Sequence, residues 1–292
     1  MDGELLRHLY HTWFDSHKSA TSARHLYSDA VILFIYAIAA LSGKSPRWAR
    51  QKGNWPLWAR RLAVPSYSQL MRRIRTPRFL AQWRAWDAEF RASLPRSPEK
   101  CVDGKPLVVG SYSKDPDARR GYLAANLWGQ GYKIHAVSSA AGVVEAFAVT
   151  ALNAGEAPVA TELVQALDLR GAVVRGDANY DSNRLYAAVA ARGGRFLAPR
   201  RQPGTGLSDR PHHPDRLRAI VELEWQPGAA QAHARHRIRI EQTFGHLTNL
   251  PFGLAPLPNF VRRLNRVTLW VTAKIALYHF HLALKYTRTN AA

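Results

Sequence analysis

The sequence has almost no cysteine. Cys101 is its one cysteine in 292 residues, so an internal disulfide is excluded and no Cys-x-x-Cys zinc motif is present. This usage is typical of a protein kept in a reducing compartment, and we expect a cytoplasmic location.

Acidic residues are also scarce. There are 21 Asp and Glu against 41 Lys and Arg, which gives a net charge of +20 and a sequence pI near 10.7. The shortage is greatest in residues 44–84, where eleven Lys and Arg occur without a single Asp or Glu. An excess of this size favours a polyanionic partner, either nucleic acid or an anionic membrane surface.

Long uninterrupted hydrophobic runs are missing as well. The apolar run Ala30–Leu41 has 12 residues, which is too short to span a bilayer. The longer run Val267–Leu284 is interrupted by Lys274, His279 and His281. We therefore expect buried helices and no membrane association, and double-stranded DNA becomes the expected partner.

Residues 1–95 are predicted to be a helical DNA-binding region. The Ser28-Asp29 pair is predicted to cap a helix that runs to about Leu41, and Ser66 or Ser68 is predicted to cap a helix from about Tyr67. A third helix is expected from about 78 to 94, with Phe79, Trp83, Trp86 and Phe90 spaced as a core stripe. Four basic residues in this region are candidates for contact with DNA phosphates: Arg47, Arg50, Arg72 and Arg73.

Residues 96–256 change to an alternation of strand-length and helix-length segments. This order predicts an α/β domain with a mixed sheet. The expected strands are 99–109, 131–139, 142–150, 171–177 and 195–198. The expected helices are 156–167 and one that is capped by Asp181-Ser182-Asn183 and continues to about Ala191. Residues 199–232, rich in Pro, Gly and Arg, are predicted to be a loop-rich insertion, and residues 257–292 a C-terminal helix.

A helix predicted over residues 235–247 carries a carboxylate on its apolar face. Helical spacing aligns Arg237, Ile240, Glu241, Phe244 and Leu247. A carboxylate facing a core needs charge compensation. Arg237 can supply it through an i, i+4 pair, and so can a divalent metal ion shared with other carboxylates.

Two further acids stand where a metal site is expected. Asp177 ends an apolar strand, at the edge where ligands collect in open α/β sheets, and Asp103 lies in the first strand. If both meet Glu241, three hard oxygen ligands suit Mg²⁺ or Mn²⁺ better than zinc. The structural alternatives are that Asp177 caps a turn and that Asp103 pairs with Lys105 or Lys133.

Four motifs follow one another in a familiar order. They are Val102-Asp103-Gly104-Lys105-Pro106, Gly131-Tyr-Lys-Ile-His135, Gly176-Asp-Ala-Asn-Tyr-Asp-Ser182 and Arg237-x-x-x-Glu241-x-x-Phe244. Together they resemble the DDE transposases of bacterial insertion sequences, in the broad IS4/IS5/IS982-like group. The resemblance covers Glu99 to Leu284, about two thirds of the chain.

This resemblance implies a ribonuclease-H-like domain with a mixed five-stranded sheet. It makes Asp103, Asp177 and Glu241 the catalytic residues and the ligands of two Mg²⁺ (or Mn²⁺) ions. It also implies hydrolysis at the element ends, attack of the freed 3′-hydroxyl on target DNA, and a homodimer on DNA. Arg237 is expected to orient Glu241 or a phosphate, and Lys133 and His135 are expected either to touch DNA or to support the strand.

The motifs depart from the family at several positions. Thr248 stands where members often carry Lys, Ala234 where they carry Tyr, Asn179 where they carry Gly and Gly104 where they carry Ser. Two alternatives therefore remain beside the transposase. One is a ribonuclease-H-like nuclease or resolvase without strand transfer, and the other is an inactive, transposase-derived DNA-binding protein.

Overall fold

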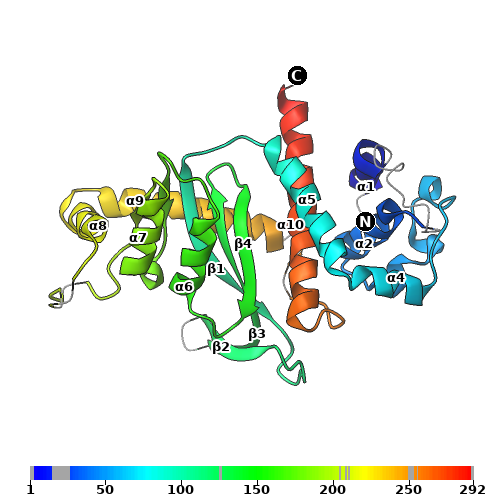
Figure 1. Ribbon diagram of the computed structural model, residues 1–292, viewed down its shortest axis with the longest axis horizontal. Helices are drawn as coiled ribbons and strands as arrows, with labels where there is room; N and C mark the ends of the chain where they lie inside the picture. The colour runs from blue at the N-terminus through cyan, green and yellow to red at the C-terminus, as the bar shows by residue number, and fades with distance from the viewer. Residues whose placement is uncertain are drawn as a thin grey trace. The chain divides into compact units, whose positions relative to one another are not determined.

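The computed structural model describes residues 3–14, 27–124, 127–203, 205–207, 209, 211–248, 253–254 and 256–290, without the side chains of 12, 13, 239, 248 and 290. The chain forms two compact units (Figure 1). The first, the helical unit, comprises Met1–Leu94 and Leu247–Ala292. The second, the α/β unit, comprises Pro95–His246.

The N-terminal part of the helical unit contains short helices with the predicted caps. Its helices are α1 (Gly3–Leu9), the π-helical turn η1 (Tyr10–Phe14), α2 (Asp29–Ser42), α3 (Pro46–Ala49), the 3₁₀ turns η3 (Lys52–Asn54) and η4 (Leu57–Ala59), α4 (Tyr67–Ile74) and α5 (Pro77–Ala92). Ser28 and Ser66 accept hydrogen bonds from the first turns of α2 and α4, which confirms the caps. On α5, the predicted stripe is buried at Phe79, Trp83 and Trp86.

The C-terminal helix α10 (Leu264–Asn290) is the longest helix of the helical unit. It starts later than position 257, after Arg263, which has a left-handed φ of 73°. Leu264–Thr289 has the length and apolarity to cross a membrane, but 72% of its most apolar window is buried. The helix packs along α5, and its buried His279 Nδ1 lies 2.5 Å from Asp87 Oδ1. These contacts identify α10 as a core helix.

The α/β unit contains a six-stranded mixed sheet within its described residues. The strands are β1 (Glu99–Val108), β2 (Arg119–Ala124), β3 (Leu127–Ser139), β4 (Val144–Ala151), β5 (Val173–Arg175) and β6 (Arg195–Leu197). The order is β2-β3-β1-β5-β6, and β4 also pairs with β3. The expectation of five strands was wrong because β2 had not been predicted. Most of β2 is exposed, so it lacks the apolar alternation that reveals a half-buried strand.

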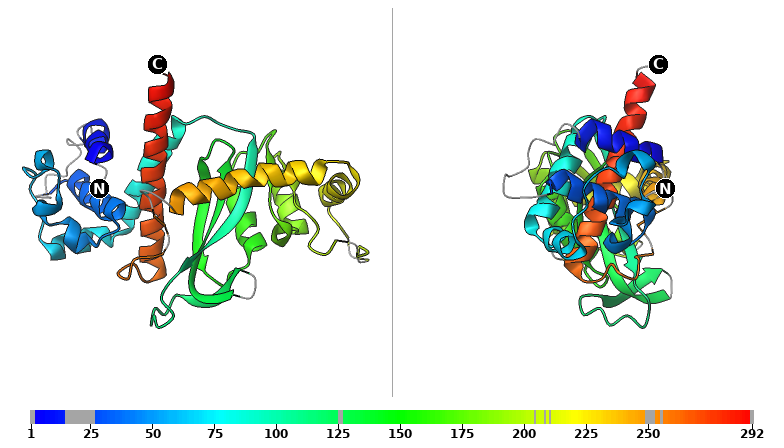
Figure 2. Two further views of the ribbon diagram at one scale, coloured as in Figure 1. Left: turned by 180° about the vertical axis from the view of Figure 1, so that it is seen from behind. Right: turned by 90° about the vertical axis from the view of Figure 1, so that its right-hand side faces the viewer.

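Helices cover both faces of this sheet. On one face, α6 (Glu156–Gln165) and α7 (Asn183–Ala191) enclose a core with Val102, Val137 and Val174. On the other face lies α9 (Ala229–Thr248), which crosses in front of the strands in the left view of Figure 2. Each face of the sheet is therefore shielded from solvent over part of its area.

The segment 199–232 is less irregular than predicted. Helix α8 (Pro214–Trp225) occupies its centre, and α9 begins at Ala229. Pro214 stands at the start of α8, where a missing N–H costs nothing, and Ala219, Ile220 and Leu223 are buried. The prediction of a loop-rich insertion was therefore wrong for these residues.

Candidate active site

Asp103 lies on the central strand β1, on the face covered by α9. Side chains alternate along a strand, so Glu99, Cys101 and Asp103 point to one face. Glu99 Oε2 lies 3.8 Å from His236 Nδ1 of α9, and Cys101 Sγ lies 3.6 Å from the His236 carbonyl oxygen. Asp103 therefore emerges beneath the same helix that carries Arg237 and Glu241.

The parallel pairing of β1 with β5 brings Asp177 level with Asp103. The last paired residues are Cys101 and Arg175, and two further residues along each strand lead to the two aspartates. Asp177 Oδ1 accepts a hydrogen bond of 2.8 Å from the Asn179 amide and caps the 3₁₀ turn η5 (Ala178–Tyr180). The capping role is thus present, and the carboxylate still lies at the strand end beside Asp103.

The charge state of Asp103 reflects its crowded surroundings. Burial raises its pKa to about 6, although the Gly104 amide donates a 2.8 Å hydrogen bond to Oδ1. The positive charge of Arg237 lowers this pKa, and the negative charges of Asp177 and Glu156 raise it. Burial is therefore the main reason why Asp103 is harder to ionise than a free aspartate, and the neighbouring charges act in both directions.

Glu156 is the member of this group that sequence reasoning missed. It is the first residue of α6, and its Oε1 lies 2.8 Å from Lys133 Nζ, with the two side chains 18% and 11% exposed. A Cβ atom built on Gly104 would lie 3.2 Å from the same oxygen, so Glu156 is packed against the residue that follows Asp103. An acid at a helix start is common, and nothing local in the sequence indicates this neighbour.

Helix α9 is joined to the Asp177 turn through a histidine. Buried His233 lies with Nε2 3.1 Å from the carbonyl oxygen of Gly176, the residue before Asp177. Burial lowers the pKa of His233 to about 4, so the ring is neutral at physiological pH. This contact sets the position of α9 along the strand ends, one turn before Arg237.

Arg237 and Glu241 differ in their surroundings. Arg237 Nε is buried and has no hydrogen-bond partner in the described part of the chain, while Glu241 is exposed. Among the described residues, no group of three His, Cys, Asp or Glu side chains is close enough to hold a metal ion. The structure thus associates Asp103, Asp177, Glu156 and Arg237, and leaves Glu241 on the exposed side of α9.

Lys133 and His135 both lie on β3, inside the unit. Lys133 pairs with Glu156, not with Asp103. His135 is fully buried, its Nε2 lies 2.9 Å from Thr150 Oγ1, and burial lowers its pKa to about 4. These positions fit the supporting role, and a fully buried His135 does not fit direct contact with DNA.

The four candidate arginines of the helical unit fall into two classes. Arg73 pairs with Asp29, and Arg50 Nε donates to the Pro65 carbonyl at 2.6 Å, so both stabilise the fold. Arg47, whose guanidinium lies 5.8 Å from the Tyr67 ring centroid, and Arg72 are exposed. Of the four, Arg47 and Arg72 are therefore the ones that present their charge to solvent.

The neighbouring carboxylates of Asp103 and Asp177 fit a hard divalent cation. Carboxylate oxygens are the donors that Mg²⁺ and Mn²⁺ prefer, and a cation would compensate the cost of burying the Asp103 charge, which is the main reason why its pKa is raised. Asp103 and Asp177 fit this role by position. Glu241 is on the neighbouring helix, and its carboxylate is exposed.

Comparison with known proteins gives one match. A family model described as a transposase DDE domain matches residues 95–280, more than half of the chain. No curated protein and no solved structure matches the chain.

Proposed function

The chain belongs to the DDE transposase family, and on that premise we propose that it cuts the ends of an insertion sequence and joins them to target DNA. The observation that supports this most directly is that Asp103, in the middle of β1, lies level with Asp177, just past the end of the parallel strand β5, beneath the helix that carries Arg237. The strand order also supports a ribonuclease-H-like fold for the α/β unit.

In the proposed site, Asp103 and Asp177 would hold divalent metal, Mg²⁺ or Mn²⁺, and Glu241 would complete the set of ligands from α9. Two such ions would activate the attacking oxygen and stabilise the leaving oxygen of a phosphodiester. The positive charge of Arg237 lowers the pKa of Asp103 and so favours the ionised form that would bind the metal, while its buried Nε–H has no partner among the described residues. His233 keeps α9 against the strand ends through Gly176.

The proposed reaction has two steps. In the first, a water oxygen bonds to phosphorus at the element end, the P–O3′ bond breaks, and a 3′-hydroxyl and a 5′-phosphate result. In the second, that 3′ oxygen bonds to a phosphorus of target DNA, and the displaced target oxygen leaves as a new 3′-hydroxyl. No oxidant or nucleotide cofactor is consumed.

The helical unit supplies a basic surface for DNA. A cavity of about 1130 Å³ in this unit is lined by arginines and by no Asp or Glu among its described residues. The arginines are Arg75, Arg84, Arg262, Arg263 and Arg266. We propose that these, with exposed Arg47 and Arg72, contact backbone phosphates, and that two copies of the chain pair two element ends.

The test uses labelled DNA that flanks this reading frame, a target plasmid and Mg²⁺. Asp177→Asn and Glu241→Gln should each lose cleavage by a factor of about 100 or more, because each removes a metal ligand while keeping the side-chain shape. Glu162→Gln is the matched control, since it removes an exposed carboxylate from α6 of the same unit. Cleavage by Asp177→Asn at the wild-type rate would refute the site assignment.

The products separate the alternatives. Joined element–target molecules support a transposase, whereas cleavage without joining indicates a nuclease or resolvase. DNA binding without any cleavage, together with no Mn²⁺ binding by calorimetry, indicates an inactive DNA-binding derivative.

A further inference from the structure

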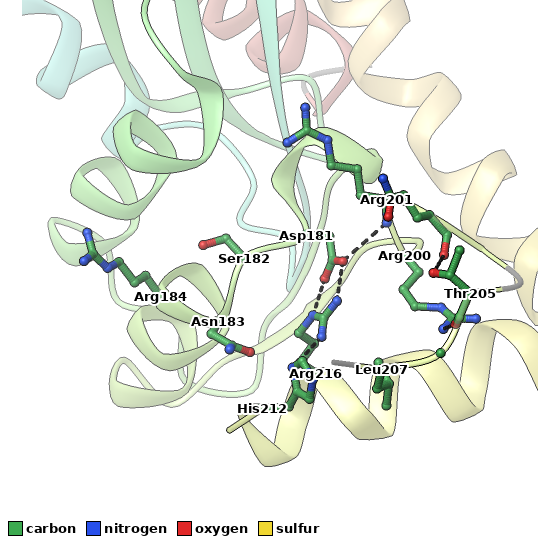
Figure 3. Close-up of a pocket in the computed structure, with 12 residues that line it drawn as sticks. Asp181, Ser182, Asn183, Arg184, Arg200, Arg201, Thr205, Leu207, His212 and Arg216 are labelled. Carbon is green, nitrogen blue, oxygen red and sulfur yellow. Dashed lines mark hydrogen bonds and ion pairs between the residues drawn. The ribbon is translucent and has the colours of Figure 1, made fainter. Parts of the chain in front are cut away.

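A second polar pocket lies in the α/β unit, just beyond Asp177. A cavity of about 600 Å³ opens between the start of α7, the residues after β6 and the start of α8. Figure 3 shows its central ion pair, in which Arg216 Nε and Nη2 lie 2.6 and 2.7 Å from the two Asp181 oxygens. Because both side chains are almost fully buried, the one acid among the described lining residues is neutralised inside the protein.

Two other arginines of the pocket have no such partner. Arg184 and Arg201 are exposed, and neither side chain forms a hydrogen bond or an ion pair with the described residues. In contrast, several exposed arginines of this unit have an acidic partner, as in the pairs Arg170–Asp168, Arg195–Glu222 and Arg218–Asp215. Figure 3 shows that Arg184 and Arg201 point away from the Asp181–Arg216 pair and that their guanidinium groups lie apart from each other.

The surroundings of Arg184 also favour an anion. Arg184 is the second residue of α7, whose first turn contains no acid, so its charge opposes the positive end of the helix dipole. Ser182 occupies the N-cap position, but its hydroxyl bonds to no helix amide. An anion beside Ser182 and Arg184 would remove the repulsion and accept a hydrogen bond from the unused hydroxyl.

The pocket is close to the strand ends. Asp181 follows Asp177 after the single 3₁₀ turn η5, and four residues at a rise of about 2 Å span roughly 8 Å. One DNA strand advances about 3.4 Å per nucleotide along a duplex. A strand whose reacting phosphate lies at Asp177 would thus pass this pocket after about two nucleotides.

We propose that the rim of this pocket binds the DNA backbone next to the reacting phosphodiester, with Arg184 and Arg201 each neutralising a different phosphate. The arginine guanidinium matches a phosphate through paired N–H···O bonds, and the two guanidinium groups lie at separate places on the rim, so each is assigned its own phosphate. The placement beside the reacting phosphate rests on the proposed transposase function, but the binding of phosphates by these arginines does not.

The test measures affinity of the full chain for a duplex oligonucleotide over a range of salt, in EDTA. Each phosphate that the protein no longer neutralises should make the slope of log K against log[salt] shallower by about 0.9. Arg184→Ala and Arg201→Ala should each show this change, and the double variant should show the sum, about 1.8. Arg184→Lys keeps the charge and should keep the slope.

Arg218→Ala is the matched control, because Arg218 is an exposed arginine of α8 that already pairs with Asp215. Its slope should equal that of the wild type. Wild-type slopes for Arg184→Ala and Arg201→Ala, or an equal change in the Arg218 control, would overturn the proposal. Because no metal is present, the result is independent of cleavage: a protein that binds with the predicted slopes but never cuts DNA would refute the transposase proposal alone.

Discussion

Replacing Asp103 by asparagine is expected to stabilise the metal-free protein. Burial and the charges of Asp177 and Glu156 raise the pKa of Asp103 from 3.8 to about 6, so ionised Asp103 destabilises the folded state. At about 1.4 kcal/mol per pKa unit, the penalty is roughly 3 kcal/mol at neutral pH. Asparagine carries no charge, and its Oδ1 can keep the 2.8 Å hydrogen bond from the Gly104 amide.

The pH dependence of this effect has a definite sign. The pKa of Asp103 is higher in the folded state than in the unfolded state, so between pH 6 and 3.8 the folded state binds more protons than the unfolded state. The wild type should therefore gain stability from this group as the pH falls through that window. The advantage of Asp103→Asn should be full above about pH 6 and absent below about pH 4.

Urea unfolding in EDTA, at neutral and acidic pH, measures the difference. Glu162→Gln, which removes an exposed carboxylate, should stay within about 0.5 kcal/mol of the wild type. Added Mn²⁺ should stabilise the wild type, because a ligand that binds the native state shifts the unfolding equilibrium. It should leave the stability of Asp103→Asn unchanged, because this variant lacks one of the carboxylates that would bind the ion. An Asp103→Asn protein no more stable than the wild type in EDTA at neutral pH would refute the reasoning.

Three further predictions concern buried charged or polar groups. Glu156→Gln should destabilise the protein by about 2–4 kcal/mol in urea unfolding, because it leaves Lys133 buried and unpaired. The double variant with Lys133→Met should recover most of the lost stability, and equal losses in the single and double variants would contradict this. His233, with a pKa lowered to about 4, stays neutral in the folded state while the unfolded state takes up a proton below pH 6.5. The free energy of unfolding should therefore fall as the pH drops from 6.5 towards 4, and His233→Gln should make that fall smaller by up to about 3 kcal/mol. Burial lowers the pKa of Lys274 from 10.5 to about 8, so its charged form costs the folded state roughly 3 kcal/mol at neutral pH, and Lys274→Met should raise the thermal midpoint at neutral pH by several degrees; an unchanged or lower midpoint would count against it.

Much of the secondary structure could be predicted because its causes are local. A helix cap such as Ser66 bonds to amides three residues away, and the stripe of Phe79, Trp83 and Trp86 follows from helical spacing. Helix α7 ends at Ala191, as predicted, and starts within the segment Asp181–Asn183 that was expected to cap it. Strand β2 was not predicted because its formation depends on pairing with β3. Most of its residues are exposed, so they lack the alternation of apolar and polar residues that indicates a strand.

Charge partners followed a different rule. Residues 44–84 contain no acid, yet Arg73 and Arg78 both pair with Asp29, which lies outside that segment. Lys133 pairs with Glu156 and not with Asp103. Each of these pairs depends on how distant segments pack, so reading one segment at a time could not reveal it.

From the sequence alone came the order of the motifs, and with it the family, the three acids expected to act and the basic character that favours DNA. The tertiary structure decided how those acids are related. The parallel register of β1 and β5 brings Asp103 level with Asp177, the packing of α6 adds Glu156, and His233 sets α9 against the strand ends. The physical reason is that residue types and short hydrophobic periods depend on neighbouring positions in the sequence, whereas strand register and helix placement arise only when distant surfaces are buried together.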